Sequence, residues 1–318
     1  MSNLAQKILK RDTRTLARVL SLVEDAQNPE LVHLLKELYP SAGRAFIIGV
    51  TGIPGSGKST LVDRLARHYS SAGKSVGIIA VDPTSPFSGG AILGDRIRMQ
   101  SLSTDPLVFI RSMATRGKMG GLSAAVNDAL LVLDAAGYEI LIVETVGVGQ
   151  DEIDIVRTAQ ATLLVLVPGM GDEVQAFKAG IMEIGDLLVI NKADREGVLK
   201  TEQELKELLS LAARPDGWNT PIIKTTALKG EGIAELADKI ADYRSFLEGA
   251  EDRGNRRLAA IRERLLEMLR ERLARSILQK ISRQQLDQYA EKMMTRELDP
   301  YTIVDRLLET AGFEEGNT

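Results

Sequence analysis

Apolar residues follow a helical pattern at the start of the chain. Within residues 1–43, an apolar stripe follows a candidate helix cap at Thr13, and a second amphipathic segment ends at Pro40. The stripe consists of Leu16, Val19, Leu20 and Val23. We therefore expect residues 1–43 to form a helical extension.

The middle of the chain, residues 44–250, alternates short apolar runs with helix-length stretches such as 58–73 and 121–137. The strand candidates are residues 45–51, 75–82, 107–112, 139–145, 161–168, 186–192 and 221–225. These runs are continuous rather than alternating, which is typical of strands buried on both faces. Strands that alternate with helices predict an α/β domain with a mainly parallel sheet flanked by helices.

Residues 251–318 carry no strand signal and predict a long helix followed by two shorter ones, the last beginning near Pro300. The apolar stripe of the long helix consists of Leu258, Ile261, Leu265, Met268, Leu269, Leu273 and Ile277. Arginines in this segment raise the alternative of a nucleic-acid surface. Glutamates at 263, 267 and 271 break up the positive field, so we favour a solvated face whose apolar side packs on the core or on a second subunit.

Composition narrows the possible chemistry. The chain of 318 residues has a net charge of −4, which gives no global attraction for nucleic acid or anionic lipid. No apolar stretch is long enough to span a membrane, and basic residues near the start leave no room for a signal peptide, so we expect a cytoplasmic protein. The absence of cysteine excludes thiolate catalysis and Cys-type zinc sites. The two histidines, His33 and His68, are expected to be surface or packing residues.

Residues 52–59 match the phosphate-binding motif G-x-x-x-x-G-K-[ST] between a predicted strand and a predicted helix. Glycines let backbone N–H groups converge on phosphate oxygens, and the helix N-terminus adds positive potential. Lys58 is expected to reach the β- and γ-phosphates, and the Ser59 hydroxyl to ligate Mg²⁺. The expected phosphate-binding residues are Gly52, Pro54, Gly55, Ser56, Gly57, Lys58, Ser59 and Thr60.

A second motif, N-K-x-D, runs from Asn191 to Asp194 on a late strand candidate. A carboxylate at the fourth position can accept hydrogen bonds from the ring N–H and the amino group of guanine, a donor pair that adenine lacks. The stem of Lys192 can cover the ribose and base. Thr226 and Ala227 resemble the last loop of GTPases, where a backbone amide meets the guanine oxygen. The sequence therefore favours GTP and GDP over adenine nucleotides.

Two further strand candidates finish with a carboxylate, Asp82 in one and Glu144 in the other. In P-loop proteins this edge of the sheet, beside the loop, is where Mg²⁺ is bound. The glycine-rich segment 83–99 resembles a switch loop and supplies Asp95, and Gly147 can bring its amide to the γ-phosphate. Capping of a helix or turn is the alternative for Asp82 and Asp95. The expected metal ligands are Ser59, Asp82, Asp95 and Glu144.

Val148 stands where Ras-type enzymes place a water-orienting glutamine. An apolar side chain cannot orient the attacking water, so we expect slow intrinsic hydrolysis and a missing group that comes from another loop, a second subunit or a partner. Gln175 and Lys178, one helical turn apart, are candidates to respond to the nucleotide, and the alternative is that they are plain surface residues. The expected catalytic residues are Lys58, Asp82, Glu144, Gln175 and Lys178.

Four segments after the P-loop together resemble the MeaB/ArgK group of P-loop GTPases. They are residues 81–99, 144–152, 171–186 and 191–194. The resemblance implies a GTPase that chaperones an adenosylcobalamin-dependent acyl-CoA mutase, such as methylmalonyl-CoA mutase, by gating cofactor loading and protecting the mutase. It also implies a homodimer built with the C-terminal helices, and an additional switch at Gln175 and Lys178.

The principal alternative is a nucleotide-dependent kinase associated with a basic amino-acid (LAO/AO) transport system, which would not need the N-K-x-D motif. Nickel-insertion GTPases of related fold usually bring Cys or His clusters, which this composition does not offer. The predicted organisation is a helical extension over 1–43, a GTPase domain over 44–250 and a dimerisation segment over 251–318.

Overall fold

The computed structural model describes residues 1–23, 28–82, 102, 104–114, 121–145, 158–169, 185–211, 214, 216–249 and 253–312. The chain divides into two compact units, Met1–Ala250 and Glu251–Thr318, and each is described by itself. Among the helices of the described ranges, none is both long and apolar enough to cross a membrane.

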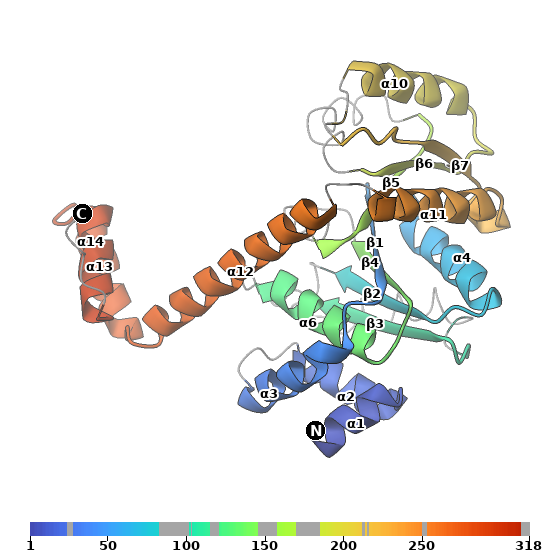
Figure 1. Ribbon diagram of the computed structural model, residues 1–318. Coiled ribbons are helices and arrows are strands. Elements are labelled where there is room, and N and C mark those ends of the chain that lie inside the picture. Colours follow the sequence, from blue (N-terminus) through green and yellow to red (C-terminus); the bar gives the residue numbers. More distant parts are fainter. Residues whose placement is uncertain are drawn as a thin grey trace. The chain divides into compact units, whose positions relative to one another are not determined.

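A seven-stranded sheet with the order β3-β2-β4-β1-β5-β6-β7 forms the centre of the first unit (Figure 1). Every neighbouring pair is parallel. The strands are β1 (Phe46–Gly52), β2 (Val76–Asp82), β3 (Val108–Ala114), β4 (Ile140–Thr145), β5 (Ala161–Leu166), β6 (Leu187–Asn191) and β7 (Ile222–Thr225). Each of the predicted apolar runs forms one of these strands, which confirms the predicted α/β fold with a parallel sheet flanked by helices.

Helices bury both faces of the sheet. The helices α4 (Lys58–Ser71) and α11 (Ile233–Gly249) pack on one face. The opposite face is covered by α1 (Asn3–Leu9), α2 (Thr13–Val23), α3 (Pro29–Leu38), α6 (Gly121–Ala135) and α10 (Val198–Leu211). In β4, Ile142 contributes to the first core cluster and Leu141 to the second, because successive strand residues point to opposite faces. This arrangement explains why the strands are apolar without alternation.

The N-terminal helices belong to the core of the first unit. Leu16 and Leu20 are fully buried in the cluster that also contains Leu133 of α6. The predicted cap at Thr13 is wrong by one residue, because the Asp12 carboxylate accepts the Thr15 N–H at 2.8 Å, the geometry of an N-cap. A short 3₁₀ helix, η1 (Tyr39–Ser41), ends this segment at the predicted proline.

Arg11 ties the N-terminal helices to the loop that precedes β4. Its Nε donates to the Ala136 carbonyl at 2.9 Å, and its guanidinium lies 5.1 Å from the centre of the Tyr138 ring. The Nη2 atom also donates to the Ser75 hydroxyl at 3.1 Å. Residues far apart in the sequence are therefore held together at this corner of the sheet.

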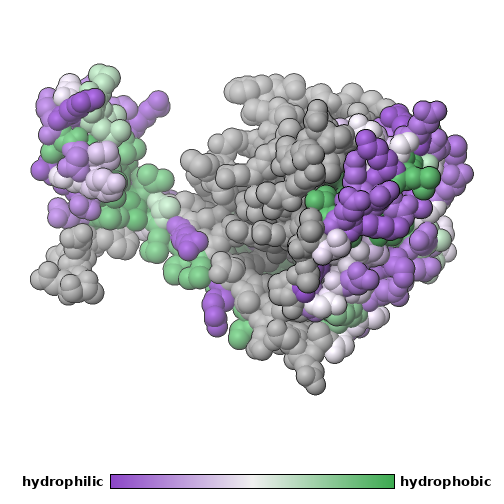
Figure 2. All heavy atoms as spheres, turned by 90° about the horizontal axis from the view of Figure 1, so that it is seen from above, coloured by the Kyte–Doolittle hydropathy of each residue, from purple (hydrophilic) through white to green (hydrophobic). Residues whose placement is uncertain are grey.

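Residues 253–312 of the second unit form three helices, α12 (Arg253–Leu278), α13 (Arg283–Met294) and α14 (Pro300–Thr310). Ser282 and Gln285 form a capping box at the start of α13, and Asp299 caps α14. Except for Ile277, the members of the predicted apolar stripe on α12 are exposed. Figure 2 shows that apolar side chains also gather elsewhere on the surface of this unit.

Candidate nucleotide-binding site

The segment after β1 forms a loop that only glycine permits at two positions. Gly52 has φ +139°, and a Cβ built there would lie 2.2 Å from the Val165 carbonyl oxygen of β5. Gly57 has φ +91° and is the N-cap of α4, which begins at Lys58. Positive φ angles are rarely adopted by residues with side chains, so these glycines shape the loop and turn the chain into the helix.

Lys58 crosses the inside of this loop. The side chain is only 5% exposed, and its Nζ donates to the carbonyls of Gly52 at 2.6 Å and Ile53 at 2.9 Å. The loop carbonyls thus hold an ammonium group at the N-terminus of α4, where the helix dipole already favours an anion. This is the arrangement that a phosphate-binding motif requires.

Ser59 and Glu144 meet next to the loop. The Ser59 hydroxyl donates to Glu144 Oε1 at 2.5 Å, although the two residues are far apart in sequence. Glu144 lies in β4, which pairs with β1, and it is 6% exposed. Asp82 ends the adjacent strand β2, two positions beyond Ala80, the register partner of Glu144. The sheet therefore brings the ends of β2 and β4 together, as the sequence predicts.

Four of the predicted site residues lie outside the described part of the chain. They are Asp95, Gly147, Gln175 and Lys178. Their predicted roles stay predictions. Within the described ranges, no group of three or more His, Cys, Asp or Glu side chains is placed to hold a metal ion.

Asn191 connects the phosphate-binding loop to the segment after β7. Its side chain is 2% exposed, and Nδ2 donates to the Ser56 carbonyl at 2.8 Å. Its Oδ1 accepts from the Thr225 hydroxyl and from the Ala227 N–H, both at 3.1 Å. The sequence identifies Asn191 only as part of a base motif, but its amide also fixes two loops relative to each other.

Lys192 adds a second link between the same segments. Its Nζ donates to the Gly55 carbonyl at 2.6 Å, and its backbone adopts φ +57°, which is uncommon for a residue with a side chain. The next N–H, that of Ala193, donates to the Thr225 carbonyl at 3.0 Å. These bonds place the long stem of Lys192 alongside the loop.

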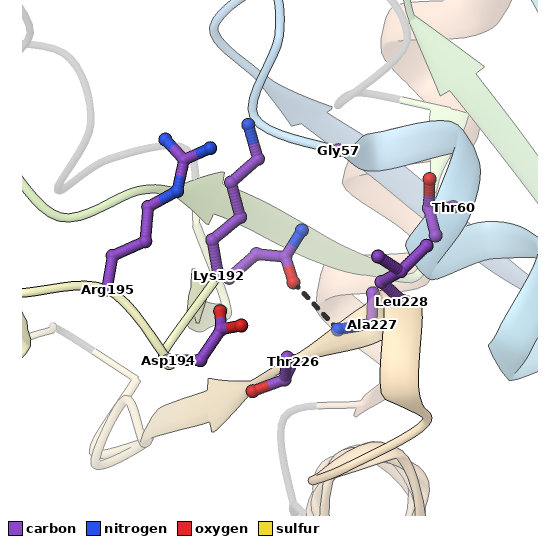
Figure 3. A pocket seen from close by; sticks show the side chains of 9 residues that line it. Gly57, Thr60, Lys192, Asp194, Arg195, Thr226, Ala227 and Leu228 are labelled. Atoms are coloured by element: carbon purple, nitrogen blue, oxygen red, sulfur yellow. Dashed lines mark hydrogen bonds between the residues drawn. The ribbon is translucent and has the colours of Figure 1, made fainter.

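A pocket of about 240 Å³ opens between these segments (Figure 3). Its lining residues are Gly57, Thr60, Asn191, Lys192, Asp194, Arg195, Thr226, Ala227 and Leu228. Lys192 and Arg195 lie on one side of it, and Thr60 and Leu228 on the opposite side. All five predicted base-binding residues, Asn191, Lys192, Asp194, Thr226 and Ala227, thus line one pocket together with residues at the start of α4.

Sequence reasoning missed three residues around this pocket. Arg195 and Leu228 line it, and Lys229 lies 3.4 Å from a carboxylate oxygen of Asp194. Both partners of this ion pair are largely exposed, so it orients Asp194 more than it stabilises the fold. Arg195 and Leu228 directly follow a recognised motif, and Lys229 lies one position further on, so proximity to the motifs is the available signal.

Comparisons with known proteins agree with this geometry. The model of the family described as "Methylmalonyl Co-A mutase-associated GTPase MeaB" matches residues 16–282. A protein of Pyrococcus abyssi is 46% identical over 312 residues, with 97% of this chain and 96% of that protein covered. GTPase ArgK of Escherichia coli is 36% identical over 250 residues, with 76% of this chain and 75% of that protein covered.

A solved structure shares the fold over almost the whole chain. The crystal structure described as an LAO/AO transport system kinase superimposes with a TM-score of 0.73 and 26% identity, covering 96% of this chain and 95% of that chain. The loop shaped by Gly52 and Gly57, the buried Lys58 and the pocket lined by Asp194 thus occur in a chain whose relatives are named as GTPases. The protein belongs to the MeaB family and is itself a GTPase.

Proposed function

We propose that the phosphates of GTP bind at the 52–60 loop and that its base enters the pocket beside Asp194. The observation that supports this assignment is the pair of hydrogen bonds at the Asn191 side chain, which donates to the Ser56 carbonyl and accepts from the Ala227 N–H. Because this link fixes the 52–60 loop relative to the segment after β7, one nucleotide can contact both, with its phosphates at the first and its base at the second. Lys58 neutralises phosphate charge, and the Asp194 carboxylate accepts from guanine N–H groups.

We also propose Ser59 and Glu144 as ligands of Mg²⁺. Hydroxyl and carboxylate oxygens are the ligands this ion prefers, and the 2.5 Å bond between them fits a site in which both serve one ion. A Mg²⁺ site at a P-loop takes its other ligands from phosphate oxygens and water, so it does not require a cluster of carboxylates. Asp82 and Asp95 complete the proposed set. When bound, Mg²⁺ neutralises charge on the β- and γ-phosphates.

Hydrolysis in this proposal is slow until a partner binds. Val148 cannot orient water, and we assign this task to groups that a partner brings into place, with Gln175 and Lys178 as the responding residues and Gly147 near the γ-phosphate. We expect the isolated protein to turn over about once per minute or less.

The proposed partner is an adenosylcobalamin-dependent acyl-CoA mutase, methylmalonyl-CoA mutase or a close relative. The description of the family supports this partner, because it names association with that mutase. A GTPase that gates cofactor loading must present different surfaces in its two nucleotide states. The exposed apolar residues of α12 support a homodimer through residues 251–318, since a second copy would bury them.

The test mixes the protein with methylmalonyl-CoA mutase and follows both GTP hydrolysis and adenosylcobalamin loading. We expect faster hydrolysis with the mutase, and loading that differs between GTP and a non-hydrolysable analogue. Gln175→Ala and Lys178→Ala should lower the rate of the free protein only a little and the mutase-stimulated rate more. Identical rates and identical loading would contradict the chaperone function.

A second candidate is a kinase, because the solved structure with a TM-score of 0.73 is described as a transport system kinase. The same assay distinguishes the two functions when it uses GTP labelled at the γ-phosphate and also contains a binding protein of a basic amino-acid transport system. Label released as inorganic phosphate, and released faster when the mutase is present, supports a GTPase partner of the mutase. Label transferred to a transport-system protein, without any effect of the mutase, supports the kinase.

A further inference from the structure

Arg64 joins the phosphate-binding helix to the turn at the base pocket. It lies on α4, and its Nε donates to the Ala227 carbonyl at 3.1 Å, while Nη2 donates to the Leu228 carbonyl at 2.7 Å. Both carbonyls belong to η2 (Ala227–Lys229), a single 3₁₀ turn that follows β7. Because Ala227 and Leu228 line the pocket, Arg64 contacts the back of a pocket wall without being one of the pocket residues.

The planarity of the peptide group gives these contacts a consequence for the pocket. The Ala227 carbonyl and the Leu228 N–H belong to one planar trans unit and point in opposite directions. When Arg64 holds the carbonyl, it also sets the direction of the Leu228 N–H. The Ala227 N–H already donates to Asn191 Oδ1 at 3.1 Å. The two ends of the Ala227 residue are therefore fixed by side chains from two different elements.

The shape of the arginine head group suits two carbonyls that are one residue apart. Guanidinium presents several N–H donors in a rigid plane, whereas the lysine ammonium is a single point of charge. Hydrogen bonds from a charged donor are also stronger than neutral ones. The turn also has backbone bonds of its own, because the Gly230 N–H donates to the Ala227 carbonyl at 3.1 Å and the Lys229 N–H donates to the Thr226 carbonyl at 2.9 Å. Arg64 adds two charged hydrogen bonds to this turn, and the bond to Leu228 holds a carbonyl that lies beyond Ala227.

We propose that Arg64 is a positioning residue for guanine recognition: it orients the Leu228 N–H toward the O6 atom of the base. This inference rests on the proposed function, since it requires that guanine occupies the pocket beside Asp194. Arg64 itself touches neither the base nor the phosphates, and it acts through the turn.

The test measures the affinity of two nucleotides for Arg64→Met and Arg64→Lys. GDP carries O6, whereas 2-aminopurine riboside diphosphate lacks it. We expect Arg64→Met to weaken GDP about tenfold, the loss of roughly one good hydrogen bond, and to change the other nucleotide less than about twofold. Arg64→Lys should fall between wild type and Arg64→Met. The KM for GTP should rise in step with the loss of GDP affinity, while kcat at saturation stays constant.

A matched control removes the same charge from α11. Arg244 pairs with Glu248 at 3.2 Å and lies over the Phe46 ring, so Arg244→Met should leave both nucleotides bound as in wild type. Equal weakening of both nucleotides by the Arg64 variants would mean a merely structural role and would overturn the proposal. Unchanged GDP binding would overturn it as well.

A parallel variant separates this inference from the proposed function. Asp194→Asn should exchange a preference for GDP for a preference for xanthosine diphosphate, because an amide donates where the carboxylate accepted. If Asp194→Asn keeps its preference for GDP, the assignment of the base pocket itself fails. If the preference changes while Arg64→Met binds GDP like wild type, only the role of Arg64 fails.

Discussion

Two glycines of the phosphate-binding loop offer a matched test of how tightly this loop is packed. Gly55 and Gly57 both have positive φ angles, +78° and +91°. A Cβ at Gly55 would meet no atom within 4 Å, whereas a Cβ at Gly57 would lie 2.4 Å from Asn191 Nδ2. Gly55→Ala therefore adds backbone strain alone, and Gly57→Ala adds both strain and a displaced Asn191.

The structure gives the size of each effect. A positive φ at a residue with a side chain costs about 1–2 kcal/mol, and both variants bear this cost. Moving Asn191 breaks the 2.8 Å bond to the Ser56 carbonyl and strains the two bonds at Oδ1. Leaving a buried amide without its partner costs about 1–3 kcal/mol. Gly57→Ala should therefore be less stable than Gly55→Ala by about 2 kcal/mol.

The assay is thermal unfolding without nucleotide, followed by tryptophan fluorescence. Trp218 is the single tryptophan of the chain and packs 4.8 Å from the Tyr243 ring, so its emission reports on the first unit alone. For a unit of this size, a difference of 2 kcal/mol lowers Tm by about 4–8 °C. Equal melting temperatures for the two variants would show that Asn191 does not hold the loop in the way described.

Two further predictions concern charged residues. Lys58→Ala should weaken GDP binding by about a hundredfold or more, because a buried charged donor at the phosphates is lost; isothermal titration measures this, and wild-type affinity would contradict the phosphate site. Hydrogen bonds from the Thr15 hydroxyl and N–H lower the pKa of Asp12 in the folded state. The carboxylate therefore stabilises the folded state above about pH 4, and this contribution is lost as the pH falls through the lowered pKa. Asp12→Asn should accordingly lose less stability than wild type when the pH is lowered from about 4 to about 2 in denaturant titrations, and parallel losses would argue against the cap.

The sheet could be predicted from the sequence because its signal is local. Each strand is a continuous apolar run, and burial on both faces by helices leaves no position free for an alternating polar residue. The P-loop and the N-K-x-D motif were predictable for a similar reason, since each combines residue type with a fixed spacing. The sequence alone predicts the cap of α2 one residue late, because Asp12 and Thr13 are both residue types that favour the N-cap position.

The links between motifs could not be predicted in the same way. The bond from Asn191 to Ser56 spans 135 residues, and the bond from Arg64 to Ala227 spans 163. Such pairs depend on the order of strands in the sheet, which places β1 beside β5 and β6 beyond it. Neither the asparagine of a base motif nor an arginine on an amphipathic helix indicates, from its local sequence, which distant carbonyl it binds.

The position of the N-terminal helices has a consequence for synthesis on the ribosome. Arg11 binds the carbonyl of Ala136, 125 residues later, and Leu16 packs in a cluster that includes residues of α6 and β4. At about 5–20 residues per second, these partners emerge about 6–25 s after the helices themselves. During that interval the first apolar stripe has no sheet to cover. The nascent chain thus exposes this apolar stripe for several seconds before the residues that bury it have been synthesised.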